Sequence, residues 1–272
     1  STHCISSAAS DVYKRQIQKI EMLENDDLAP LVDQEALKEF RSRALSPEHP
    51  VARGMAENPD TFFTHRESCN NYYDAVPAIV EDYMNKVSEI TGRKYGLFSY
   101  YGAADAERVI IAMGSVTEAI RETIDHLTAQ GEKVGLVAVH LYRPFSAKHF
   151  LAAVPATAKT IAVLDRTKEP GANGEPLYLD VKECFYGKEN APVIVGGRYG
   201  LGSNDTTPAQ ILAVYENLAL PEPKNQFTLG IVDDVTCTSL PQKEEVAMGG
   251  EGMFEAKFYG LGADGTVGAN KN

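Results

Sequence analysis

The sequence predicts an α/β protein whose main domain is a parallel-rich sheet with helices on both faces. From residue 107 onward, short apolar runs alternate with segments of helical periodicity. The runs are apolar throughout, which is typical of strands buried on both faces of a sheet. Polar or Gly-rich loops follow the runs, so each pair of elements indicates one strand–helix unit.

The segment before the sheet predicts mainly helices and connections. Residues 33–45 have a helical pattern, and prolines within 46–50 end it. Residues 53–71 mix polar and aromatic side chains without a clear period, which indicates an ordered loop. Residues 94–105 are rich in Gly, Tyr and Ala and are interpreted as a linker.

The clearest helix of this first part is predicted over 74–92. Asp74 can cap its start, Pro77 suits a first turn, and Gly92 suits its end. One face of this helix carries apolar residues at helical spacing, namely Val80, Tyr83, Met84, Val87 and Ile90.

The elements of the sheet domain follow in order along the chain. Five runs predict strands, namely Arg108–Met113, Val134–Val139, Thr160–Leu164, Pro192–Val195 and Phe227–Val232. The helices between them are expected from Val116 to a stop at Gly131, and over Ala147–Ala153, Pro176–Tyr186 and Pro208–Leu218. Ser115–Glu118 fits a capping box for the first of these helices.

Composition excludes several functional classes. The net charge of −12 disfavours nucleic acid and anionic membranes as partners. No apolar run approaches the ~20 residues that cross a bilayer, so a soluble cytoplasmic protein is expected. The four cysteines are widely spaced and form no C-x-x-C pair, so no iron–sulfur cluster or zinc site is predicted. Buried free thiols are the simpler interpretation.

The loops at the carboxyl ends of the predicted strands form the binding edge of such a sheet, and they are Gly114–Ser115, His140–Phe145, Asp165–Gly171 and Gly196–Ser203. Two of these loops carry residues that could bind a ligand. Gly196–Ser203 contains four glycines and Arg198, whose guanidinium could hold a phosphate or carboxylate; a tight connection with a surface Arg is equally consistent. Asp165–Glu169 is interpreted as a solvated loop, or else as a contact for a neighbouring domain. No catalytic residue and no metal ligand set can be assembled.

The last stretch, Phe254–Asn272, reads as a strand, a Gly-rich turn and the first turn of a helix. Such a device can hold an anion on backbone N–H groups. The candidate binding residues are Gly260, Gly262, Asp264, Gly265 and Thr266. Because no helix body follows, the chain is expected to be a piece of a larger protein. Residues 1–16 look like translated adaptor sequence and are expected to lie outside any core.

From Ile17 onward, over 256 of the 272 residues, the chain resembles the central part of the pyruvate:ferredoxin (flavodoxin) oxidoreductase family. Six strings carry the resemblance, namely Ser46–Val51, Tyr72–Pro77, Tyr100–Arg108, Asp165–Gly171, Gly197–Ser203 and Phe258–Lys271. The resemblance implies that residues 17–94 end a pyrimidine-binding domain. It implies that residues 95–245 form a domain like the carboxyl-terminal domain of transketolase. Residues 246–272 would open a third, CoA-associated domain.

The resemblance also implies a cytoplasmic, homodimeric parent enzyme with thiamine diphosphate, Mg²⁺, [4Fe–4S] clusters and coenzyme A. Its partners would be ferredoxin or flavodoxin and the other domains of its own chain. No cofactor site is complete here, so the piece alone is expected to be inactive. Arg198 and the turn around Gly260 are expected to border coenzyme A. Alternatives are another 2-oxoacid:ferredoxin oxidoreductase, or a non-catalytic module that binds coenzyme A or a neighbouring domain.

Overall fold

The computed structural model describes residues 22–241 and 243–244. It divides at Leu97/Phe98 into two compact units, a helical unit and a sheet domain. The predicted segments 1–16 and 246–272 lie outside the described residues. None of the described helices combines the length and the apolar character that crossing a membrane requires.

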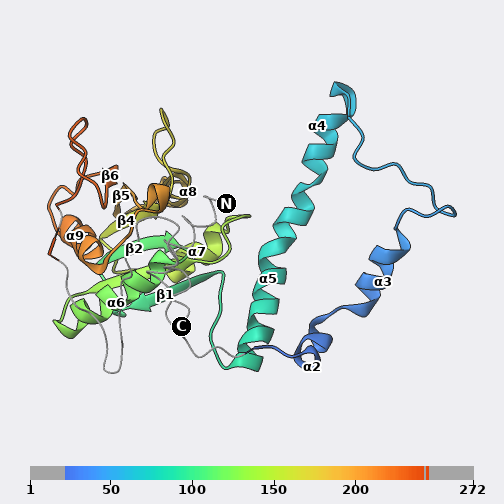
Figure 1. Cartoon of the computed structure of the whole chain (residues 1–272), viewed down its shortest axis with the longest axis horizontal. Coiled ribbons are helices and arrows are strands. Elements are labelled where there is room, and N and C mark those ends of the chain that lie inside the picture. Colours follow the sequence, from blue (N-terminus) through green and yellow to red (C-terminus); the bar gives the residue numbers. More distant parts are fainter. Residues whose placement is uncertain (1–21, 242, 245–272) are drawn as a thin grey trace, which may run out of the picture. The chain divides into compact units, whose positions relative to one another are not determined.

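The described residues of the helical unit, 22–97, form helices and loops, with one isolated β-bridge between Ser46 and His49 (Figure 1). Its elements are α2 (Asn25–Leu28), the 3₁₀ turn η1 (Ala29–Leu31), α3 (Gln34–Ser42), α4 (Pro59–Ser68) and α5 (Asn70–Thr91). The predicted helix over 33–45 is confirmed as α3, which Asp33 caps by accepting the N–H of Ala36 at 2.9 Å.

The prediction of a loop over 53–71 was wrong, because most of it forms α4 and the start of α5. Pro59 occupies the first turn of α4, where its missing N–H costs nothing. Cys69 ends α4 and begins α5 with helical backbone angles, so α5 starts at Asn70 and not at Asp74. Pro77 therefore lies inside α5, not in its first turn. Gly92 ends α5 in a left-handed conformation, as expected.

In the described part of the sheet domain, six strands pair in the order β1-β3-β2-β4-β5-β6. The strands are β1 (Phe98–Gly102), β2 (Arg108–Met113), β3 (Val134–Val139), β4 (Thr160–Asp165), β5 (Val193–Arg198) and β6 (Phe227–Thr228). All pair in parallel except β1, which pairs antiparallel with β3. The α/β fold with a parallel-rich sheet is confirmed.

Four strands differ from the prediction. The third predicted strand is one residue longer than expected, since β4 ends at Asp165. The expected linker over 94–105 contains β1, which covers the edge of β3. The fourth predicted strand is longer than expected, since β5 runs on to Arg198. The fifth is shorter, since β6 consists of Phe227 and Thr228 only.

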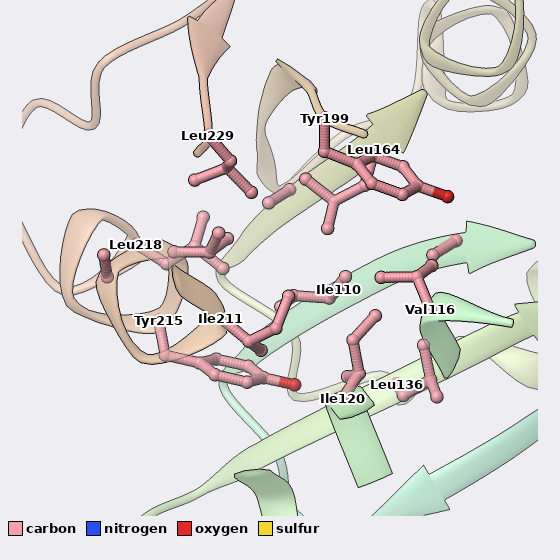
Figure 2. Close-up of a cluster of buried hydrophobic side chains, with 14 of the residues drawn as sticks. Ile110, Val116, Ile120, Leu136, Leu164, Tyr199, Ile211, Tyr215, Leu218 and Leu229 are labelled. Atoms are coloured by element: carbon pink, nitrogen blue, oxygen red, sulfur yellow. The ribbon is translucent and has the colours of Figure 1, made fainter. Parts of the chain in front are cut away.

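Helices cover both faces of the sheet, as predicted. The connecting helices are α6 (Val116–Ala129), α7 (Ala147–Ala153), α8 (Pro176–Phe185) and α9 (Pro208–Leu218), and the 3₁₀ turn η2 spans Leu201–Ser203. On one face α6 packs against α9, and Figure 2 shows Ile110 of β2 meeting Ile120 and Ile211 from these helices. On the other face Phe150 of α7 contacts Phe98 of β1 and Phe185 of α8.

The capping box predicted at Ser115–Glu118 does not form. Ser115 has helical backbone angles and makes no side-chain cap hydrogen bond. The chain instead turns at Gly114, whose φ of +79° suits glycine, and the hydroxyl of Thr117 donates to the Gly114 carbonyl at 2.8 Å.

Two buried tyrosines make the sheet domain less stable at alkaline pH. Tyr215 is 1% exposed, and its hydroxyl donates a hydrogen bond to the Gly135 carbonyl at 3.0 Å. Burial raises the pKa of Tyr215 well above its usual value, and burial also raises the pKa of Tyr199 to about 12. Both tyrosines therefore stabilise the fold below pH ~10, and this stability is lost as the pH rises above that value.

We expect Tyr215→Phe to lower the free energy of unfolding by ~1 kcal/mol at pH 8, through the lost hydrogen bond. At pH ~11 the unfolded wild-type chain gains ~1.4 kcal/mol by ionising Tyr215, and the variant cannot. The difference between the two proteins should therefore vanish near pH 11. Urea unfolding at both pH values measures it, and a difference that does not change with pH would contradict the assigned environment of Tyr215.

Candidate functional site

The loops predicted to form a binding edge do lie at one edge of the sheet. They follow β2, β3, β4 and β5, which are mutually parallel neighbours. The direction in which the chain adds strands changes between β2 and β4. From β2 the chain continues to β3 on one side, whereas β4 lies on the other side of β2. In open α/β sheets such a point at the carboxyl edge is the usual place for a ligand.

Asp165, the last residue of β4, is 6% exposed, so its interpretation as part of a solvated loop was wrong. Its two carboxylate oxygens accept the N–H groups of Leu177 at 3.0 Å and Tyr178 at 3.1 Å. Burial raises the pKa of Asp165, and these two hydrogen bonds oppose that rise. Asp165 thus caps the start of α8 from a neighbouring strand, at the positive end of the helix dipole.

Arg198 ends β5 and is 8% exposed. Its Nη2 donates to the Gln226 carbonyl at 2.8 Å, and its Nη1 lies 3.6 Å from Glu175 Oε1. Glu175 is itself 2% exposed and is the N-cap residue of α8. Nη1 has no hydrogen-bond partner among the described residues, but it is shielded from solvent.

The sequence therefore located Arg198 at the correct edge but in the wrong environment. It was expected in a loop that leaves the strand, whereas it is the last residue of a longer strand. In this conformation a phosphate could reach Nη1 only if the chain that shields it moved. The acidic partner Glu175, which sequence reasoning missed, stands directly before Pro176 at the helix start.

Other side chains at this edge also bind its loops to one another. Arg166 is exposed, and its Nε donates to the Gly200 carbonyl at 2.9 Å. Arg143, after β3, stacks 3.9 Å from the centre of the Tyr142 ring and lies 2.8 Å from Asp180 of α8. The three arginines each link two segments of the chain at this edge.

The described residues give no metal or thiol centre. Within 22–241 and 243–244, no three His, Cys, Asp or Glu side chains lie together as metal ligands. Cys69 and Cys184 are half-buried free thiols, whereas Cys237 is exposed, so the expectation of burial was wrong for Cys237. Gly260, Gly262, Asp264, Gly265 and Thr266 lie outside the described residues, and their ligand role stays a prediction.

An open cleft of about 630 Å³ lies at the opposite edge of the sheet, beside β1 and the start of β3. Its polar groups bind one another: Lys133 pairs with Asp105 at 2.7 Å, and the Tyr101 hydroxyl donates to Asp125 at 2.6 Å. These groups leave little unsatisfied capacity for a ligand, so the cleft is not a second candidate site.

Comparison with known proteins gives matches over most of the chain. The family model "Pyruvate:ferredoxin oxidoreductase core domain II" matches residues 106–211. A second, for the thiamine diphosphate-binding part of pyruvate flavodoxin/ferredoxin oxidoreductases, matches residues 9–85. The two models match successive parts of the chain, with residues 86–105 between them.

Curated relatives agree with the family models. A pyruvate-flavodoxin oxidoreductase of Klebsiella pneumoniae is 59% identical over 258 residues, and a pyruvate:ferredoxin oxidoreductase of Moorella thermoacetica is 56% identical over 257 residues. Each alignment covers 94% of this chain and 22% of the relative, so the chain spans about a fifth of their length. A solved 2-oxoglutarate:ferredoxin oxidoreductase from Magnetococcus marinus matches 62% of this chain and 29% of its own, with a TM-score of 0.35 and 19% identity.

Proposed function

The chain belongs to the pyruvate:ferredoxin (flavodoxin) oxidoreductase family, and from this premise we propose that it forms part of an enzyme that oxidises pyruvate. The reaction converts pyruvate and coenzyme A into acetyl-CoA and CO₂ and passes two electrons to ferredoxin or flavodoxin. The observation that carries the proposal is the identity of 56–59% over 94% of the chain to such enzymes.

Thiamine diphosphate, which the second family model names, would supply the chemistry that breaks the bond between the carboxylate and the carbonyl carbon of pyruvate. The described residues do not by themselves fit this cofactor. Between residues 22 and 97 they offer no cluster of carboxylates for Mg²⁺, and the groove on α5 is lined by apolar and aromatic side chains. We therefore assign no reaction step to residues of this chain.

The role that the geometry supports is structural. Asp165, Glu175 and Arg198 join the carboxyl ends of β4 and β5 to the start of α8 and to the chain before β6. This fixes the loops that leave the sheet, and it gives neighbouring domains of the parent enzyme a rigid surface. Contacts of Arg198 and of the turn at Gly260–Thr266 with coenzyme A remain proposals, as do the iron–sulfur clusters, a homodimer and a cytoplasmic location.

The function is tested on the full-length enzyme from which this sequence derives. We expect dye reduction that requires both pyruvate and coenzyme A, and none with the 272-residue chain under the same conditions, even with thiamine diphosphate and Mg²⁺ added. Faster reduction with 2-oxoglutarate or a branched 2-oxoacid than with pyruvate would favour a different 2-oxoacid oxidoreductase. Turnover by the 272-residue chain alone would contradict the structural role.

A further inference from the structure

The helical unit has almost no hydrophobic core of its own. Among its described residues, only Leu97, at its end, is buried. Its exposed large apolar side chains are Met22, Leu28, Val32, Phe40, Leu45, Val51, Met55, Phe62, Phe63, Tyr72, Tyr73, Ile79, Tyr83 and Tyr95. Helices are stable in proteins mainly because an apolar face packs against something else, and exposed apolar surface on this scale marks an interface.

The apolar side chains are most concentrated on one face of α5. A groove of about 440 Å³ runs along it, lined by Ile79, Val80, Tyr83, Met84, Val87 and Tyr95. Tyr95 reaches the groove because the chain folds back after Gly92, and its N–H donates to the Ser88 hydroxyl at 3.0 Å. The groove is therefore shaped by a defined turn of the backbone.

Polar side chains of α5 lie beside the groove and opposite it. Beside the groove, Asp82 and Lys86 form an exposed ion pair at 2.7 Å, and Lys86 Nζ lies 4.8 Å from the centre of the Tyr83 ring. Asn85 is also exposed, and at helical spacing it lies nearly opposite Val80. One face of α5 is thus suited to water and the other to apolar packing, so an occupant of the groove must present apolar side chains.

We propose that the groove on α5 is a docking site for the rest of its own domain, supplied by a part of the same polypeptide that lies outside these 272 residues. The proposal rests on the proposed function. Two observations favour this occupant over a separate partner. A single domain model covers α3, α4 and most of α5, and the described residues of that domain contain no core. The relatives are also several times longer than this chain, which leaves ample sequence to complete the domain.

Thiol labelling of the full-length enzyme and of the 272-residue chain tests the proposal. Val80→Cys places a thiol in the groove, and Asn85→Cys is the matched control on the polar face of the same helix. Maleimide labelling is followed by mass spectrometry of the peptide, which separates these thiols from the native cysteines. In the 272-residue chain both thiols should react at similar rates. In the full-length enzyme the thiol at position 80 should react roughly 100-fold more slowly, while the control keeps its rate.

A photo-crosslinking residue in place of Tyr83 identifies what covers the groove. We expect the crosslinked full-length enzyme to keep the mass of one chain on a denaturing gel. A product of double mass would assign the groove to a second copy and overturn the proposal. Slow labelling at position 80 already in the 272-residue chain, or fast labelling in both proteins, would also overturn it. Neither measurement uses pyruvate, so a protected groove in an enzyme that does not oxidise pyruvate would reject only the proposed function.

Discussion

Arg198→Ala should lower the free energy of unfolding of the 272-residue chain by about 3 kcal/mol. The guanidinium lies beside Glu175, and the two side chains are only 9% and 3% exposed. Removing one partner of a buried ion pair leaves the other charge without compensation, which is strongly destabilising. The loss corresponds to roughly 6–12 °C in Tm for a domain of this size. Thermal unfolding followed by circular dichroism measures it.

Two further variants separate this effect from a simple loss of an arginine. Arg166→Ala removes an exposed guanidinium with a single described hydrogen bond, to Gly200, and should cost no more than ~1 kcal/mol. Adding Glu175→Gln to Arg198→Ala removes the uncompensated charge and should restore part of the stability. If Arg198→Ala leaves Tm unchanged but raises the KM for coenzyme A in the full-length enzyme, Arg198 contacts the ligand and the structural role is wrong.

Gly197→Ala should destabilise the sheet domain by about 3 kcal/mol, because the strand has no room for a Cβ at this position. The added atom would lie 2.2 Å from Phe227 Cε2 and 2.9 Å from Leu164 Cδ2. Phe227 is fully buried, and it pairs with Gly197 across β5 and β6, so its ring cannot move aside without repacking the core. Overpacking of this kind typically costs 1–3 kcal/mol, and occasionally more. Urea unfolding of the 272-residue chain measures it.

Gly202→Ala is the control from the same Gly-rich segment. A Cβ added at Gly202 would have no described atom within 4 Å, and only the φ of +63° opposes a side chain, so a cost of ~1 kcal/mol is expected. Combining Gly197→Ala with Phe227→Leu should cost less than the sum of the two single substitutions, since the smaller side chain makes room. Equal effects of Gly197→Ala and Gly202→Ala would show that packing against Phe227 is not the reason for Gly197.

Gly197 and Gly202 show what the sequence could not distinguish at the candidate site. Gly196–Ser203 was interpreted as one Gly-rich turn that could hold an anion. The structure divides it: Gly197 and Arg198 belong to β5, whereas Gly200 and Gly202 form the turn. A glycine required by a buried ring and a glycine required by a positive φ are identical in sequence. Only the neighbours in space distinguish them.

The helix α4 and the strand β1 were not predicted for a related reason, since their local sequence patterns are weak. In α4 the aromatic residues Phe62 and Phe63 are adjacent, so no helical period was visible, although the helix forms. The strand β1 has an irregular composition and is defined by its pairing with β3, which lies more than thirty residues later. Non-local pairing of this kind leaves little trace in a short sequence window.

The sequence by itself determined the α/β class, the place of the central strands and the helices between them, and the family. It could do so because apolar runs and helical periodicity are local consequences of burial. Only the tertiary structure decided what the charged residues at the carboxyl edge do. Asp165, Glu175 and Arg198 are separated along the chain, and their burial and pairing arise only when β4, β5 and α8 come together. Burial turns a residue suited to binding a ligand into one that holds the fold, because a desolvated charge needs a partner from the protein itself.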